Sequence, residues 1–339
     1  MSIRYSRHTE VSRRDAARLA MKERAYELLE ENKDYFESRS AKNSDDKQAS
    51  EYEIVDKVKE KMPDWCKNLS PFWVRLITGT IYLGLMIVCL FLGNVPTMIV
   101  LCIVSAISAG EFYYMLRRGS RLPNEFIGIV AAIVYIPVTN YFGLKGWAFV
   151  TLCLMGVLLV WYVFWMKAKI SDVGVSLFGA VYTGGNLAGF MYLSAILPYP
   201  TSSFVLLIIF ISVCSNDTFA YLIGSKFGKH KLAPRTSPKK SWEGFGAGIL
   251  GCVIFWVLLH YVPGINLELW LCILFGIGSA LFQVLGDLAE SRIKRNSGFK
   301  DSGFILPGHG GLLDRCDSLF LASMSSLIFF VIAGVVPLV

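Results

Sequence analysis

The sequence has 339 residues, of which 54% are hydrophobic and only 17% are charged. Soluble domains carry about 25% charged residues, so this composition excludes most soluble folds and indicates a chain that lies largely in lipid. The formal net charge is +7, yet residues 1–70 hold 15 basic and 15 acidic residues and are neutral. The excess belongs to the apolar remainder, which argues against a basic terminal tail that binds nucleic acid.

The first 70 residues form a charged tail, in which we expect a helix over 14–38 and a linker over 39–52. Balanced charge favours a solvated regulatory or oligomerising segment. A helix on the membrane surface is the alternative, but it would have little attraction to anionic lipid. We therefore divide the chain into a partly helical tail, 1–70, and a transmembrane domain, 71–339, that carries the activity.

Nine apolar stretches have the length that a membrane span requires, which is about 20 residues for about 30 Å of hydrocarbon. They cover residues 72–93, 95–116, 122–141, 146–167, 173–197, 202–224, 243–263, 266–288 and 316–337. The second carries Glu111, and glycines interrupt the fifth, which allows close helix packing or an irregular stretch. The predicted fold is all-α: a polytopic integral membrane protein with about nine transmembrane helices and a cytoplasmic N-terminal helical tail.

The loops between these spans differ in charge. If the tail is cytoplasmic, the loops on its side hold 16 basic residues, whereas those on the other side hold only Lys145. Basic residues accumulate in cytoplasmic loops, so this asymmetry supports an odd number of spans. The eight cysteines lie mostly inside apolar runs and form no CxxC pair, which is typical of membrane-helix residues and not of a disulfide framework or a zinc site.

One charged loop follows the sixth span. Asp217 lies within an apolar run, where a charged side chain costs about 2.5–3.5 kcal/mol on insertion scales, so we expect a functional role for it. Lys239, Lys240 and Ser241 precede the seventh span. Ser241 is predicted to cap that helix, whose N-terminal N–H groups attract anions, and the lysines complete a phosphate cradle. The alternative, a positive-inside flank, explains the lysines but not Asp217.

The second charged loop lies between Asp287 and Asp314. Between or beside these carboxylates stand the basic residues Lys294, Arg295, Lys300 and Arg315. Carboxylates and phosphate oxygens together hold Mg²⁺, and the basic residues would neutralise the remaining phosphate charge. These residues indicate a multispan membrane enzyme for metal-assisted phosphoryl or nucleotidyl transfer at its cytoplasmic face.

His309 lies in the same loop beside Gly310 and Gly311, which let the backbone approach a ligand closely. A turn-stabilising hydrogen bond accounts for His309 equally well, because an ionised phosphate nucleophile needs no histidine base. A zinc site is disfavoured, since no second His or Cys stands at ligand spacing.

The stretch SRIKRNSGFKDSGFILPGHGGLLDRCDS closely resembles the signature of the CDP-diacylglycerol synthase (phosphatidate cytidylyltransferase) family. Its fixed positions are met by Ser291, Lys294, Arg295, Lys300, Asp301, Pro307, His309, Gly310, Gly311, Asp314, Arg315 and Asp317. The upstream stretches NDTFAY and SPKKSWEG are also similar to this family, so the resemblance covers roughly residues 70–339 and leaves out the tail.

The resemblance implies a reaction of CTP with phosphatidate that yields CDP-diacylglycerol and pyrophosphate and requires Mg²⁺, with room for a second, monovalent cation. The implied catalytic residues are Asp287, Asp314, Lys294, Arg295 and Arg315, with Asp287, Asp314 and, as a further candidate, Asp217 as metal ligands. The implied substrate-binding residues are Asp217, Lys239, Lys240, Ser241, Ser291, Lys300, His309, Gly310 and Gly311. The lipid bilayer and a homodimer partner are also expected, and nucleic acid is not.

Three other functions compete with this interpretation. A CTP-dependent polyprenol (dolichol-type) kinase is the nearest, and it would release CDP where a cytidylyltransferase releases pyrophosphate. A CDP-alcohol phosphotransferase is disfavoured because its Asp-rich motif is absent. An anion transporter would place a charge at mid-depth, whereas Asp287 and Asp314 lie at the ends of predicted spans. For the location we expect the endoplasmic reticulum with the site facing the cytoplasm; a bacterial inner membrane is the alternative.

Overall fold

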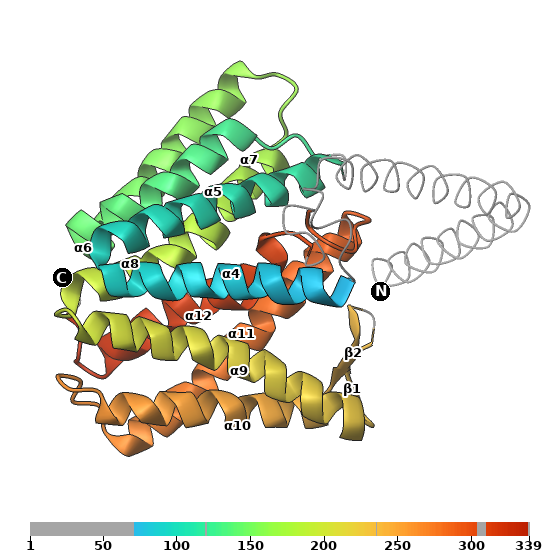
Figure 1. Cartoon of the computed structure of the whole chain (residues 1–339). Helices are drawn as coiled ribbons and strands as arrows, with labels where there is room; N and C mark the ends of the chain where they lie inside the picture. Colours follow the sequence, from blue (N-terminus) through green and yellow to red (C-terminus); the bar gives the residue numbers. More distant parts are fainter. Residues whose placement is uncertain (1–70, 119–120, 235, 304–309, 338–339) are drawn as a thin grey trace, which may run out of the picture. The chain divides into compact units, whose positions relative to one another are not determined.

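The computed structural model describes residues 71–118, 121–234, 236–303 and 310–337. The predicted tail helix, the linker and His309 lie outside the described residues. The elements are α4 (Pro71–Leu92), α5 (Asn94–Arg118), α6 (Glu125–Phe164), α7 (Ile170–Ala180), η1 (Val181–Gly185), α8 (Asn186–Ile196), α9 (Thr201–Phe227), β1 (Lys231–Ala233), β2 (Ser237–Ser241), α10 (Trp242–Leu258), η2 (Leu259–Tyr261), α11 (Leu269–Asn296) and α12 (Leu313–Ile332) (Figure 1).

Apolar helices dominate the described part of the chain. Six of them, α5, α6, α9, α10, α11 and α12, are long and apolar enough to cross a membrane. This confirms the predicted all-α, polytopic membrane fold. Each predicted span coincides with helix over most of its length. The number of nine crossings stays a prediction, because length and composition alone support six among the described residues.

The third and fourth predicted spans fall on one element, α6, which is broken at Gly143. There the backbone leaves the helical region, with φ +63° and ψ −151°, a conformation that glycine adopts without a steric penalty. The hydroxyl groups of Tyr135 and Thr151 lie 2.8 Å apart. Sixteen residues of straight helix would separate them by about 24 Å, so the two halves of α6 fold back on each other.

The fifth predicted span consists of α7, the π-helical turn η1 and α8. The π-helical turn η1 is the irregular stretch that the glycines of this span allow. A Cβ atom on Gly184 would collide with the backbone of Ala132 in α6, and one on Gly189 would lie 2.8 Å from the carbonyl oxygen of Ser323 in α12. Gly184 lets η1 approach α6 and Gly189 lets α8 approach α12, as small residues do in membrane bundles.

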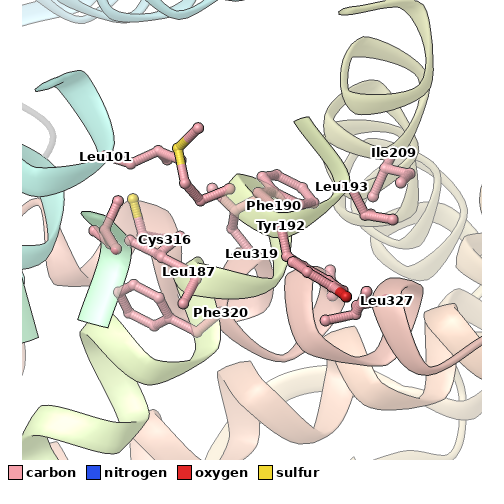
Figure 2. Close-up of a cluster of buried hydrophobic side chains, with 14 of the residues drawn as sticks. Leu101, Leu187, Phe190, Tyr192, Leu193, Ile209, Cys316, Leu319, Phe320 and Leu327 are labelled. Atoms are coloured by element: carbon pink, nitrogen blue, oxygen red, sulfur yellow. The ribbon is translucent and has the colours of Figure 1, made fainter. Parts of the chain in front are cut away.

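The core gathers around α8. Leu187, Phe190 and Leu193 of this helix are at most 2% exposed. Figure 2 shows them beside Leu101 of α5, Ile209 of α9 and a set of side chains from α12. The α12 residues in this cluster are Cys316, Leu319, Phe320 and Leu327. This packing fixes α12, which carries Asp314 in its first turn and Asp317 one turn further on.

A short antiparallel hairpin, β1–β2, connects α9 to α10, with Lys231 opposite Ser241 (Figure 1). The sequence predicted a loop here, so the hairpin is a correction to that prediction. Ser241 ends β2 and its Oγ accepts a hydrogen bond from the backbone N–H of Gly244 at 3.2 Å, so its predicted role as the cap of α10 is confirmed. A Cβ on Gly244 would press against the carbonyl oxygen of Ala220, so α9 and α10 approach closely at this end.

Candidate active site

A cavity of about 420 Å³ lies where the ends of α9, α10, α11 and α12 meet the β1–β2 hairpin. Both charged loops of the sequence analysis contribute to it. Of the predicted site residues, it is lined by Asp217, Lys239, Lys240, Ser241, Asp287, Lys294, Asp314 and Arg315. Eight predicted side chains, spread over nearly 100 residues of the chain, therefore meet in one place.

Lys240 joins the two loops directly. Its ammonium group forms an ion pair with the carboxylate of Asp287, on α11. The other carboxylate oxygen of Asp287 accepts a hydrogen bond of 3.2 Å from the hydroxyl of Ser291, one helical turn further on. The predicted substrate residue Ser291 thus contacts a predicted metal ligand, although it does not itself line the cavity.

Lys294 is held between two carboxylates. Its Nζ lies 2.5 Å from Glu290 Oε2 on the same helix and 2.6 Å from Asp314 Oδ1 on α12. Its side chain is only 11% exposed, so little water screens these charges. Lys294 therefore ties α11 to α12 at the wall of the cavity.

Asp314 is saturated by donors. Besides Lys294, the backbone N–H of Ser302 donates to its Oδ2 at 2.9 Å and the backbone N–H of Gly311 donates to the same oxygen at 3.0 Å. Gly310, at φ +86°, makes the turn that brings the N–H of Gly311 into place. The two predicted glycines therefore act here through the backbone, around a carboxylate.

Three carboxylates come close enough to share one metal ion. Oxygen atoms of Asp287, Glu290 and Asp317 all lie within 4.8 Å of one another, and Glu290 and Asp317 are buried. Hard oxygen ligands of this kind suit Mg²⁺. The group shares Asp287 with the ligand set predicted from the sequence, but it contains Glu290 and Asp317 where the prediction had Asp314 and Asp217.

Glu290 and Asp317 are not among the site residues predicted from the sequence. Both follow a predicted aspartate by three residues: Glu290 follows Asp287, and Asp317 follows Asp314. Residues three apart lie on one face of a helix, so this spacing was a usable signal. Asp317 also filled a fixed position of the family signature.

The remaining predicted residues lie elsewhere. Arg295 and Lys300 are exposed and do not line the cavity, and Arg295 Nη1 donates a 3.4 Å hydrogen bond to the carbonyl oxygen of Phe299. The predicted roles of both stay predictions. The role of His309 also stays a prediction, because this residue lies outside the described part of the chain.

A larger hollow of about 740 Å³ lies between the two halves of α6. Its walls are aliphatic and aromatic side chains such as Val130, Phe149 and Val157, and Lys145 is its one charged lining residue among those described. Apart from Lys145, this groove is lined by no acidic or basic side chain from the described ranges, so it offers no chemistry comparable to that of the polar cavity.

Known proteins with similar sequences indicate the family to which this chain belongs. The sequence model of the Cytidylyltransferase family matches residues 73–333. The phosphatidate cytidylyltransferase of Staphylococcus haemolyticus is 34% identical over 251 residues, which cover 72% of this chain and 94% of that protein. The enzyme of the same name from Mycobacterium tuberculosis is 39% identical over 160 residues, 47% of each chain.

The match spans the membrane helices, the β1–β2 hairpin and the helices that carry the cavity's acidic and basic residues. It leaves out the charged tail, as the resemblance seen in the sequence did. The chain is an integral membrane protein that belongs to the cytidylyltransferase family.

Proposed function

We propose that this protein transfers a cytidylyl group from CTP to phosphatidate, forming CDP-diacylglycerol and pyrophosphate. One observation carries the proposal: lysines and an arginine from both charged loops converge with a cluster of carboxylates in one cavity of a cytidylyltransferase-family chain. The names of the relatives supply the lipid substrate. Both substrates are polyanions, which such a cavity can bind only if their charge is neutralised.

Lys239, Lys240 and Ser241 would receive the triphosphate. They precede α10, and its N-terminal backbone N–H groups favour an anion there, although Ser241 already occupies the N–H of Gly244. The triphosphate would compete with Asp287 for Lys240. Binding of CTP would therefore release a carboxylate for a cation.

The donor set fits Mg²⁺, because oxygen atoms of three carboxylates lie within 4.8 Å of one another and substrate phosphate oxygens would complete the ligand shell. Asp287, Glu290 and Asp317 would hold the ion, with Asp217 and Asp314 lining the same cavity as the further candidates. A bound Mg²⁺ would supply Lewis-acid stabilisation of the charge that develops on the transferred and leaving phosphates. A second, monovalent cation remains part of this proposal.

In the transfer, a phosphate oxygen of phosphatidate forms a bond to the α-phosphorus of CTP, and the bond from that phosphorus to the bridging oxygen breaks. Pyrophosphate leaves with the electron pair. The attacking phosphate is ionised, so no side chain has to remove a proton. Lys294 and Arg315 would orient the anions and offset their charge, and fixed charges of this kind account for most of the catalysis in phosphoryl transfer.

The cavity's position relative to the membrane is also a proposal. The basic residues gathered at this end of the helices support a site that faces the cytoplasm. We propose the endoplasmic reticulum on account of the long charged tail, with a bacterial inner membrane as the alternative because the relatives compared are bacterial. A homodimer within the bilayer completes the proposal.

The test is an assay of the purified full chain in phospholipid nanodiscs with CTP labelled in the α-phosphate, phosphatidate and Mg²⁺. The expected result is label in a CDP-lipid and equimolar pyrophosphate. A polyprenol kinase would instead give CDP and a phosphorylated polyprenol, so a parallel reaction contains dolichol in place of phosphatidate. Release of CDP without CDP-lipid contradicts the proposal.

A further inference from the structure

Glu111 is a carboxylate buried in the bundle at the end of α5. It is 7% exposed, and it belongs neither to the family signature nor to the lining of the polar cavity. An ionised carboxylate in such surroundings is costly unless hydrogen-bond donors surround it. The groups that donate hydrogen bonds to Glu111 therefore indicate the role of this side chain.

Among the described residues, two donors to Glu111 come from the start of α12 and a third comes from the connection between α11 and α12. The backbone N–H groups of Leu312 and Leu313 donate to Glu111 Oε1 and Oε2 at 3.1 Å and 2.8 Å. The hydroxyl of Ser302 donates to Oε2 at 3.2 Å. The first N–H groups of a helix have no partner within it, and Leu312 at the N-cap has no side-chain oxygen to offer. Glu111 caps α12 from another helix.

The fit around this carboxylate is tight. A Cβ atom on Gly303 would collide with Glu111, and one on Gly311 would collide with both Ser302 and Glu111. The two chain segments can reach the carboxylate together only because these positions are glycine. The contact is thus specific in shape as well as in charge.

The same contact leads to the active site through Ser302. Its hydroxyl donates to Glu111, while its backbone N–H donates to Asp314 on the first turn of α12. Asp314 holds Lys294, and Asp317 lies one turn further along α12 in the carboxylate cluster. A shift of the α12 N-terminus would move all of these groups relative to α11.

We infer that Glu111 is a positioning residue for cytidylyl transfer: it fixes the first turn of α12, so that Asp314, Arg315 and Asp317 face α11 across the cavity. Its effect on turnover rests on the proposed function. Its effect on α12 does not. A misplacement of about 1 Å can lower a rate about 100-fold, so a side chain outside the cavity can matter greatly to the reaction.

The first experiment measures the contact without activity. Hydrogen–deuterium exchange is followed in the full-length Glu111→Gln variant in nanodiscs. The amide of the variant keeps one acceptor, but its NH₂ group faces backbone donors, so a charge-assisted hydrogen bond is lost. We therefore expect amides in Gly310–Asp317 to exchange at least about tenfold faster. Peptides from α9 and α10 should be unchanged.

The second experiment measures turnover. In Glu111→Gln we expect kcat to fall about 100-fold while the KM for CTP changes less than about threefold, because Lys239 and Lys240 are untouched. Glu111→Asp, which keeps the charge, should recover part of kcat. Ser108→Ala is the matched control: this buried serine lies one turn earlier on α5 and its hydroxyl has no partner among the described residues.

The inference is overturned if Glu111→Gln leaves exchange at the start of α12 unchanged, or if exchange rises equally in every helix. If that variant does not insert, Ser302→Ala, which deletes one of the three donors, must raise exchange in the same segment or the inference fails. An inactive wild-type protein would contradict the proposed function alone, since the exchange result does not depend on it.

Discussion

The apolar groove within α6 and the polar cavity differ in both size and charge, and the larger of the two has the fewer charged side chains. The groove within α6 measures about 740 Å³ and the polar cavity about 420 Å³, yet the smaller one contains the convergent charges. Five carboxylates and four cationic side chains line it. In a membrane protein, an apolar hollow is ordinary because the surrounding lipid tails are also apolar. Buried ionisable groups are costly there, so they indicate a functional site. Charge, and not volume, identifies the site.

The contrast between the two hollows predicts that substitutions in the polar cavity lower activity most, and the largest loss of activity is expected from Asp287→Asn. This change removes the partner of Lys240 and one member of the carboxylate cluster, and we expect CDP-diacylglycerol formation to fall by about 1,000-fold or more, comparable to the loss of a key charge-stabilising group elsewhere. Turnover is measured with labelled CTP. Wild-type turnover in this variant would remove Asp287 from the proposed mechanism.

Asp172→Asn is the matched control for that experiment. Asp172 is also buried, but it accepts hydrogen bonds from the backbone N–H groups of Leu122 and Lys169 and does not line the cavity. We expect this variant to unfold at a lower temperature and to keep its specific activity. A comparable loss of activity here would mean that burial, and not position in the cavity, explains the effect.

A second comparison separates the ligand sets that the sequence and the structure favour. Asp317→Asn removes a carboxylate of the cluster, so we expect the Mg²⁺ concentration for half-maximal activity to rise about 100-fold, the upper range for lost metal-site contacts. Asp314→Asn should chiefly lower kcat, because Asp314 is occupied by Lys294 and two backbone N–H groups. If Asp314→Asn raised the Mg²⁺ requirement and Asp317→Asn did not, Asp314 and not Asp317 would be the metal ligand.

A smaller effect is expected from Lys240→Met, which keeps the aliphatic stem and removes the charge. Loss of a hydrogen bond to a charged group costs about 1.5–3 kcal/mol, so the KM for CTP should rise roughly tenfold or more. Lys226→Met is the control, since this exposed lysine at the end of α9 does not line the cavity. Equal KM values for Lys240→Met and the wild type would exclude Lys240 from triphosphate binding.

The smallest effect is expected from the apolar groove. Val130→Ala and Val157→Ala enlarge it from its two walls, and substitutions at partly exposed positions usually change stability by about 0.5 kcal/mol or less. Activity should stay within about twofold of the wild type in both. A tenfold loss with normal membrane insertion would show that the groove takes part in the reaction.

Much of the fold followed from residue pattern. Apolar runs of about 20 residues predicted helices at every position where the structure has them, and Ser241 predicted the start of α10. The β1–β2 hairpin was missed because SPKKS alternates too little to indicate a strand. The break at Gly143 was found only as a gap between two predicted spans, since a single backbone angle leaves no trace in hydropathy.

The candidate site divides in the same way. Asp217 was selected from the sequence because a charge in an apolar run is costly. Asp287 was selected as a metal ligand, and Lys240 and Lys294 were selected as partners for phosphate. The structure brings all four to the cavity. Glu111 was noticed only as a charge inside a span. Its partners stand about 200 positions later, and no local pattern could join them.

The sequence by itself determined that this chain spans a membrane, where its charges lie and which family it resembles, because hydropathy and motif spacing are local properties. Only the tertiary structure decided which charges touch. It paired Lys240 with Asp287, surrounded Asp314 with donors, gathered Asp287, Glu290 and Asp317, and brought Glu111 to α12. The physical reason is that electrostatic partnership depends on distances of a few ångströms, and helix packing sets those distances between residues that the chain keeps far apart.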